Sequence, residues 1–317
     1  MNKITIIENY SEIGAGTRGA ALGVDAMKVA ALNRKSDFFI KHNTVQIEDS
    51  YKLLNIDFLH SRAKRIEYVI DTFNSISEEV YDVLQGYNFP IVLAGDHSSA
   101  GGTIAGIKKA NPNKKLGVIW IDAHADMHSP YTSPSGNLHG MSLATALDSD
   151  NYDNRIFEID TPTKEKWNEL KNIADISPKL LSENLVFIAL RDTEQPENNY
   201  ISENNIKVVR VDELRNRGAK TIAEETLTYL TKCDIIYISF DVDSMDPDLV
   251  SYGTGTPVKN GLSEQEANIL INSLLESKKV ACLEVVEINP CLDNKQNTMA
   301  ETAFRILESA VSVVENR

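Results

Sequence analysis

The sequence predicts an α/β protein built on a largely parallel β-sheet. Short apolar runs alternate with segments of helical periodicity along the 317 residues, which is the order of elements in a parallel sheet whose strands are joined by helices. Within the runs the apolar residues are nearly continuous rather than alternating. That pattern is typical of strands that are covered on both faces.

Seven of these runs are predicted to be strands. In chain order they cover residues 4–7, 89–93, 116–121, 185–190, 208–211, 235–240 and 281–288. Several of them run directly into acidic residues or histidines. Those polar positions matter because ligands of open parallel sheets bind outside the carboxyl ends of the strands.

Helical patterns lie between the predicted strands. Residues 65–85 carry apolar side chains at a spacing of three to four, which predicts an amphipathic helix. Ser263 and Glu266 form a capping-box pattern that begins a second helix, and residues 298–317 are predicted to form the last one. The Gly-rich residues 12–20 lack the GxGxxG order, so we expect a turn entering a helix rather than a dinucleotide loop.

The chain is predicted to form a single domain over residues 1–317. Residues 148–184 are polar and charged around Trp167, and we expect them to form a surface excursion with a short helix. The sequence contains neither an internal repeat nor a Pro/Gly-rich linker that would indicate a domain boundary.

Composition excludes several classes of partner. The net charge of −14 argues against nucleic acid and anionic membranes, since both favour Lys/Arg patches. No apolar run approaches the roughly 18 residues of a membrane helix, so we expect a soluble, cytoplasmic protein. The three cysteines lack CxxC spacing and are predicted to be reduced.

The chemistry is concentrated in Asp122, His124 and Asp126, which alternate directly after the predicted strand 116–121. Alternate residues of an extended chain project from one side, so these three side chains converge. Such groups at the end of a buried strand repel one another or carry a desolvation cost. Bound dications would remove both problems, and the pattern therefore favours a metal site.

Two further strand ends extend this cluster. The combined set of candidate ligands is His97, Asp122, His124, Asp126, Asp241 and Asp243. Its four carboxylates would balance two dications, and oxygen with some imidazole nitrogen suits Mn²⁺ while tolerating Fe²⁺, Co²⁺ or Zn²⁺. Two metals roughly 3.5–4 Å apart generate a hydroxide nucleophile near neutral pH. Each motif alone also fits a polar turn, but three at three strand ends favour a binuclear site.

These motifs resemble the arginase/agmatinase (ureohydrolase) family. The matching segments are residues 95–98 (GDHS), 122–126 (DAHAD), 239–243 (SFDVD) with Asp246-Pro247, and 287–290 (EINP). The resemblance implies a three-layer α/β/α fold around a mostly parallel eight-stranded sheet. It also implies two Mn²⁺ per subunit held by the six candidate ligands, and a bridging hydroxide that attacks a guanidinium carbon. A homo-oligomer, trimer or hexamer, is expected as well.

The loop after Asp126 looks like the arginase version, which implies L-arginine as substrate and urea with L-ornithine as products. The resemblance implies that Ser135 and Asn137 bind the α-carboxylate. It also implies that His139 relays a proton to the leaving amine, that Glu287 pairs with the guanidinium, and that Asp126 also touches the nucleophile.

Two positions depart from the arginase pattern. His128 stands where arginases often carry an Asn that contacts the α-carboxylate, and Glu194 stands where an Asp helps to hold the α-amino group. Asp192 and Glu197 match the pattern, and all three acids also fit a solvated acidic turn.

Alternative functions remain open at this stage. Another guanidino compound, such as agmatine, guanidinobutyrate or formiminoglutamate, could be the substrate, although agmatine would leave the carboxylate-binding groups without partners. A non-catalytic homologue would be expected to lose a ligand or His139, and this chain keeps them all. Deacetylase-like amide hydrolysis would require one metal and a different ligand set.

Overall fold

The computed structural model describes residues 3–47, 54 and 57–317. Its centre is an eight-stranded sheet in the order β2-β1-β3-β8-β7-β4-β5-β6, with every neighbouring pair parallel. The strands are β1 (Ile4–Asn9), β2 (Asn43–Gln46), β3 (Phe89–Ala94), β4 (Leu116–Ile121), β5 (Leu185–Ile188), β6 (Lys207–Val209), β7 (Ile235–Asp241) and β8 (Val280–Val286). The predicted fold class is confirmed.

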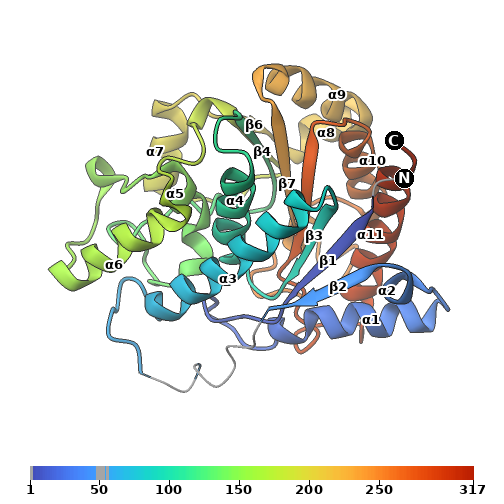
Figure 1. The fold of residues 1–317 in the computed structure, drawn as a ribbon, viewed down its shortest axis with the longest axis horizontal. Helices are drawn as coiled ribbons and strands as arrows, with labels where there is room; N and C mark the ends of the chain where they lie inside the picture. The colour runs from blue at the N-terminus through green and yellow to red at the C-terminus, as the bar shows by residue number, and fades with distance from the viewer. Residues whose placement is uncertain (1–2, 48–53, 55–56) are drawn as a thin grey trace.

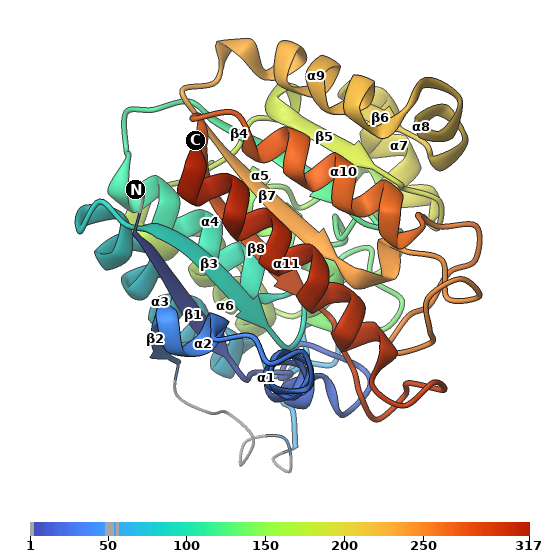
Figure 2. The ribbon, with the colours of Figure 1, turned by 90° about the vertical axis from the view of Figure 1, so that its right-hand side faces the viewer.

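Helices cover both faces of the sheet (Figure 1). One face packs against α3 (Ile66–Gln85), α4 (Ser99–Ala110), α5 (Ser142–Leu147) and α7 (Gln195–Glu203). The other packs against α1 (Gly23–Asn33), α2 (Phe38–Lys41), α8 (Val211–Arg217), α9 (Ala219–Tyr229), α10 (Glu264–Leu275) and α11 (Thr298–Asn316). Figure 2 shows α9, α10 and α11 in front of the sheet. The remaining α-helix of the described chain, α6 (Thr161–Lys171), lies against α3.

Strand β4 shows why its sequence is continuously apolar. Ile119 and Ile121 belong to the hydrophobic cluster beneath α10 and α11, whereas Val118 and Trp120 belong to the cluster beneath α3 and α4. Since alternate side chains enter opposite layers and both layers are dry, each position of the strand favours an apolar residue.

The predicted elements are found with small shifts at their ends. The strands predicted over 185–190 and 281–288 end two residues earlier, at Ile188 and Val286. Ser263 caps α10 as expected, with its hydroxyl accepting from the backbone N–H of Glu266 at 3.2 Å.

The sequence patterns missed β2. Its four residues are mostly exposed at the edge of the sheet, so the apolar signal used to find the other strands is weak there.

The polar excursion over 148–184 contains the predicted short helix, α6, whose Trp167 is fully buried and donates to Asp150 at 2.8 Å. Cys233, Cys282 and Cys291 are free thiols. Within the described part of the chain, no helix has the length and apolar content needed to cross a bilayer.

Sheet order determines where the polar strand ends meet. The strands β3, β8, β7 and β4 are consecutive neighbours and run in one direction, so their carboxyl ends form one edge. The motifs of residues 95–98, 122–126, 241–243 and 287–290 follow these four strands. They come from separate parts of the sequence but are brought to a single site.

Candidate metal centre and substrate pocket

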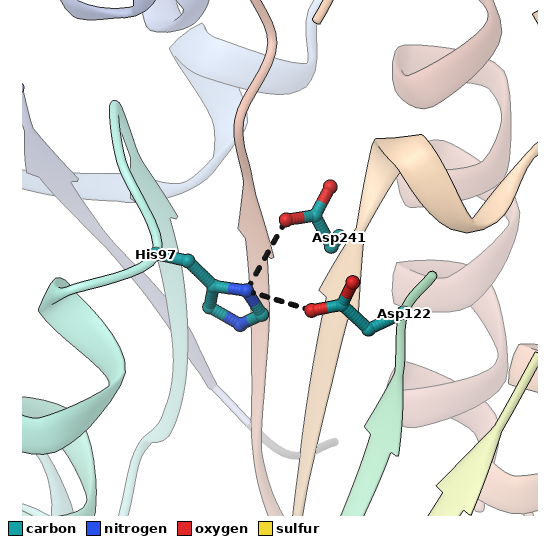
Figure 3. A group of neighbouring side chains, drawn as sticks. All are labelled: His97, Asp122 and Asp241. Atoms are coloured by element: carbon teal, nitrogen blue, oxygen red, sulfur yellow. Dashed lines mark ion pairs between the residues drawn. The ribbon is translucent and has the colours of Figure 1, made fainter. Parts of the chain in front are cut away.

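His97 lies at the middle of a group of carboxylates. Its Nδ1 atom is 3.0 Å from Oδ2 of Asp122, 3.0 Å from Oδ2 of Asp126 and 3.1 Å from Oδ2 of Asp241. Figure 3 shows His97, Asp122 and Asp241 pointing toward one another from β3, β4 and β7. One ring N–H cannot donate to three oxygens, whereas a cation can be bound by all four atoms.

A second group shares Asp122 with the first. His124 Nδ1 lies 3.0 Å from Oδ2 of Asp243 and 3.5 Å from Oδ1 of Asp122. Both triplets, His97–Asp122–Asp241 and Asp122–His124–Asp243, have ligand atoms close enough to hold a metal ion. These two adjoining groups contain five of the six sequence-predicted ligands, and the sixth, Asp126, contacts His97 at 3.0 Å.

Burial makes this arrangement unfavourable without a cation. Among the residues that the structure describes, His97 Nδ1 and Asp122 Oδ2 are buried without a hydrogen-bond partner. Burial and the neighbouring charges of Asp243 and Asp122 raise the pKa of Asp241 well above its usual value, and burial with Asp122 raises that of Asp126 to about 6. Orphaned buried atoms and mutually repelling carboxylates both fit divalent cations at this site.

The carboxylates are held by the backbone. Asp122 Oδ1 accepts from the N–H of His124 at 2.7 Å, and Asp241 Oδ1 accepts from the N–H of Asp243 at 2.7 Å. These bonds close tight turns at the strand ends and leave Oδ2 of each carboxylate directed at His97. Strand alternation and local turn bonds therefore pre-organise the candidate ligands.

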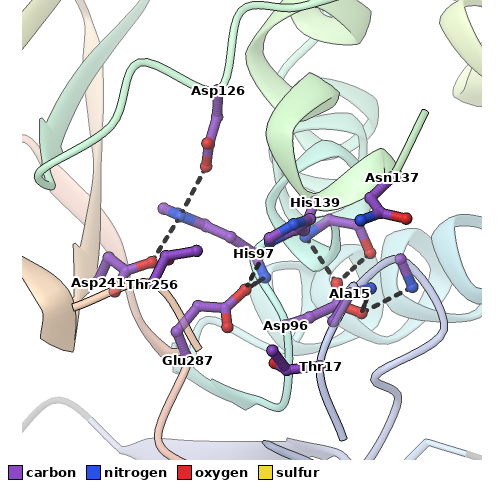
Figure 4. A network of polar contacts seen from close by, with 12 residues as sticks. Ala15, Thr17, Asp96, His97, Asp126, Asn137, His139, Asp241, Thr256 and Glu287 are labelled. Atoms are coloured by element: carbon purple, nitrogen blue, oxygen red, sulfur yellow. Dashed lines mark hydrogen bonds and ion pairs between the residues drawn. The ribbon is translucent and has the colours of Figure 1, made fainter. Parts of the chain in front are cut away.

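Glu287 and His139 form a pair beside this centre (Figure 4). Glu287 Oε1 accepts from the backbone N–H of His97 at 2.9 Å and lies 3.3 Å from His139 Nδ1. Burial lowers the pKa of His139, but the hydrogen bond and negative charge of Glu287 outweigh the effect of burial. The pKa of His139 is therefore raised to about 9. Glu287 and Asp126 both have positive φ, 67° and 48°. Such a conformation is uncommon outside glycine and is concentrated at functional sites.

A cavity of about 310 Å³ opens above the centre. The candidate α-carboxylate ligands Ser135 and Asn137 line its wall, where Asn137 N–H donates to Ser135 Oγ at 3.1 Å. Gly16 packs across from them. A Cβ at Gly16 would lie 2.5 Å from the side-chain Nδ2 atom of Asn137, so a larger residue there would require the Asn137 side chain to shift.

Three acids also line the cavity, and we call them the acidic rim: Asp192, Glu194 and Glu197. The first two are largely exposed, whereas Glu197 is buried and accepts from the backbone N–H groups of Glu194 and Met127. Glu194 caps α7, and together with Glu197 it forms a capping box. Part of this acidic pattern therefore serves helix initiation.

His128 contacts the acidic rim directly. Its Nε2 atom is 3.2 Å from Oε2 of Glu194 and 3.4 Å from Oε2 of Glu197, and its Nδ1 is 3.1 Å from Thr132 Oγ1. The two positions at which the sequence departs from the arginase pattern, His128 and Glu194, are thus in contact with each other.

Sequence reasoning missed three residues that organise the site: Asp96, Thr256 and Ser239. Asp96 is buried and accepts from the N–H groups of Gly14 and Ala15, at 2.8 and 3.1 Å. The carbonyl oxygen of Gly14 in turn accepts from the His139 N–H at 3.2 Å. Thr256 donates to Asp243 Oδ2 at 3.0 Å, and Ser239 Oγ lies 2.7 Å from His97 Nε2. Asp96 and Ser239 occur within the quoted motifs, so the motifs contained a signal for two of the three.

Comparison with known proteins identifies close similarity to arginases. The model of the family described as Arginase family matches residues 3–312. Arginase of Bacillus subtilis strain 168 is 34% identical over 308 residues, covering 96% of each chain. The crystal structure of Bacillus caldovelox arginase has a TM-score of 0.81 at 32% identity and covers 98% of both chains. Formimidoylglutamase from Bacillus subtilis subsp. subtilis is only 18% identical, with a TM-score of 0.73, covering 99% of this chain and 88% of that one, and shares the fold alone.

Proposed function

This chain belongs to the arginase family of hydrolases, and we propose that it hydrolyses L-arginine to urea and L-ornithine with two Mn²⁺ ions per subunit. One observation supports this most strongly. Candidate cation ligands and the Glu287–His139 pair line a single cavity, whose lining also includes the neutral donors Ser135 and Asn137 and the three acids of the acidic rim.

The residues that would hold the two cations are the six candidate ligands. Five of them form the two groups that share Asp122, and the sixth, Asp126, lies 3.0 Å from His97. Four carboxylates balance the charge of two dications, and the oxygen-rich set with two imidazoles suits Mn²⁺. When bound, the metal pair supplies Lewis-acid stabilisation of negative charge and lowers the pKa of water enough to provide a nucleophile near neutral pH.

The protein's own residues orient the substrate and handle its protons. The Glu287 carboxylate would pair with the guanidinium, because an ionised acceptor binds planar N–H groups strongly and in a defined orientation. His139, whose imidazolium is stabilised by Glu287, would donate a proton to the amine that leaves as ornithine.

The outer walls favour an amino acid over a simple amine. Hydroxyl and amide groups of Ser135 and Asn137 would donate to an α-carboxylate, while the acidic rim would attract an α-ammonium group. Agmatine has no carboxylate, so its binding would leave the polar donors unpaired at a cost in kcat/KM.

A product panel with the Mn²⁺-loaded protein tests this proposal. L-Arginine, agmatine and guanidinobutyrate are assayed for urea, and formiminoglutamate for formamide. We expect kcat/KM for L-arginine to exceed the others by about 100-fold, the order of discrimination when a substrate lacks a group that a partly exposed site binds. A higher kcat/KM on any other compound would replace arginine as the substrate.

The predicted homo-oligomer, the single domain over residues 1–317 and the cytoplasmic location stay predictions. Size-exclusion chromatography with light scattering would distinguish a monomer of 35.2 kDa from a trimer or hexamer.

A further inference from the structure

A buried carboxylate lies beneath the candidate metal centre and takes no part in the chemistry proposed above. Glu284 is in the central strand β8 with none of its surface exposed. Its Oε1 accepts from the Ser99 hydroxyl, and its Oε2 accepts from the Tyr237 hydroxyl at 2.5 Å. Burying an ionised group in a central strand costs free energy, so the interactions of Glu284 must compensate for its desolvation.

Hydroxyl groups lie between Glu284 and His97. Tyr237 and Ser239 are two residues apart on β7, so their side chains share a face of the sheet, and Ser239 is paired with Glu284 on the neighbouring strand β8. Ser239 Oγ lies 2.7 Å from His97 Nε2. Two hydroxyl groups on one face of β7 therefore contact a candidate metal ligand at one end and the buried acid at the other.

Metal binding would set the direction of these hydrogen bonds. A cation among the carboxylates requires the lone pair of His97 Nδ1, so the ring proton must be on Nε2 and be donated to Ser239. The Ser239 hydroxyl can then donate to Tyr237, and Tyr237 to Glu284. An ionised carboxylate only accepts, so Glu284 is the natural end of this chain.

The electrostatics agree with this direction. Burial and the charge of Glu284 raise the pKa of Tyr237 well above its usual value, so the phenol keeps the proton that it donates. Burial raises the pKa of the Glu284 carboxyl, and the hydrogen bonds from Ser99 and Tyr237 oppose that rise. These hydroxyl groups therefore stabilise the ionised carboxylate that accepts at the end of the hydrogen-bond chain.

We propose that Glu284 and Tyr237 are positioning residues of the metal centre, which act through Ser239 to hold His97 in the tautomer that presents Nδ1 to a metal. This inference rests on the metal-binding part of the proposed function. Neither residue is among the described residues that line the cavity. Partners that orient a metal-bound imidazole typically change metal affinity by 10–100-fold when they are removed.

The experiment measures Mn²⁺ affinity by calorimetry in chelator-treated protein, for the wild type, Tyr237→Phe and Glu284→Gln. The chain offers a matched control, since Tyr10 donates to the buried acid Glu8 at 3.0 Å on β1. We expect Tyr237→Phe and Glu284→Gln each to weaken at least one Mn²⁺ site by about 10–100-fold, while Tyr10→Phe and Glu8→Gln stay within about twofold of the wild type.

The double variant Tyr237→Phe/Glu284→Gln adds a second measurement. Because both residues act through one chain of contacts, we expect it to bind Mn²⁺ about as weakly as the weaker single variant rather than with the product of both losses. If the double variant instead loses Mn²⁺ affinity by the product of the two single losses, the proposed chain of contacts is overturned. Thermal unfolding of the metal-free proteins separates a purely structural role, in which stability falls and affinity does not.

Unchanged Mn²⁺ affinity in Tyr237→Phe and Glu284→Gln would overturn this inference alone. If Glu284→Gln fails to fold, the nearly isosteric Tyr237→Phe still decides the outcome. Absence of Mn²⁺ binding by the wild-type chain would overturn the metal-binding part of the proposed function and this inference with it.

Discussion

The candidate metal centre and the acidic rim, although they line one cavity, are built in different ways. Side chains of the centre are mostly buried, follow central strands and are bonded to backbone N–H groups. On the rim, Glu197 is also buried, but the side chains of Asp192 and Glu194 are 64% and 50% exposed and follow the short strand β5. A buried centre tolerates little change, whereas an exposed rim can vary with the substrate.

Asp241→Ala is expected to have the largest effect, because it removes a candidate ligand from the buried centre. We expect loss of stoichiometric Mn²⁺ and a fall in urea release of more than about 1,000-fold, since binding and chemistry depend on the same group. His124→Ala should behave alike. The exposed Asp248→Ala is the control. Full activity with two bound metals in Asp241→Ala would refute the ligand assignment.

His139→Gln tests whether His139 is a proton donor beside the metal centre or one of its ligands. We expect kcat to fall by about 100- to 10,000-fold with both metals retained, because a general acid is lost and a ligand is not. Metal loss, measured by elemental analysis, would show that His139 belongs to the centre instead.

The pH profile of His139→Gln gives an independent check. The raised pKa of about 9 means that the imidazolium exists below that pH and is lost above it. Wild-type kcat should therefore fall as pH rises toward 9, and bound cations would shift this limb to lower pH. The variant should lack the limb; an unchanged profile would assign it to another group.

Asn137→Ala should have an intermediate effect confined to the pocket wall. Losing one donor to an α-carboxylate is expected to raise KM for L-arginine by about tenfold, the equivalent of a hydrogen bond to a charged group. Mn²⁺ affinity should be unchanged, and agmatine, which has no carboxylate, should be affected by less than about twofold. Equal losses on both substrates would exclude this role.

His128→Asn is expected to have the smallest effect on L-arginine, within about threefold in kcat/KM or a slight improvement, because asparagine can donate to the same carboxylate. The contact with Glu194 also predicts coupling. In a double-mutant cycle with Glu194→Asp, residues in contact typically deviate from additivity by about 0.5–3 kcal/mol. Collapse of arginine hydrolysis in His128→Asn alone would indicate that the rim is matched to another substrate.

Much of the fold was predictable because its signals are local. Continuous apolar runs such as residues 116–121 indicate strands buried on both faces, and capping patterns such as Ser263 with Glu266 indicate helix starts. The edge strand β2 lacked that signal since its side chains are mostly exposed. The candidate ligands were also recognisable, because strand alternation places Asp122, His124 and Asp126 on one side.

By itself, then, the sequence determined the class of fold, the family and the residues able to bind cations, because these follow from periodicity and from motifs within a few positions. Tertiary structure alone decided which groups became partners. His128 and Glu194, which are in contact, lie 66 positions apart in the sequence. His97 and Glu284, which are linked through side chains of β7, lie 187 positions apart. Such pairings depend on sheet order and loop packing, which bring side chains together over distances that no local pattern records.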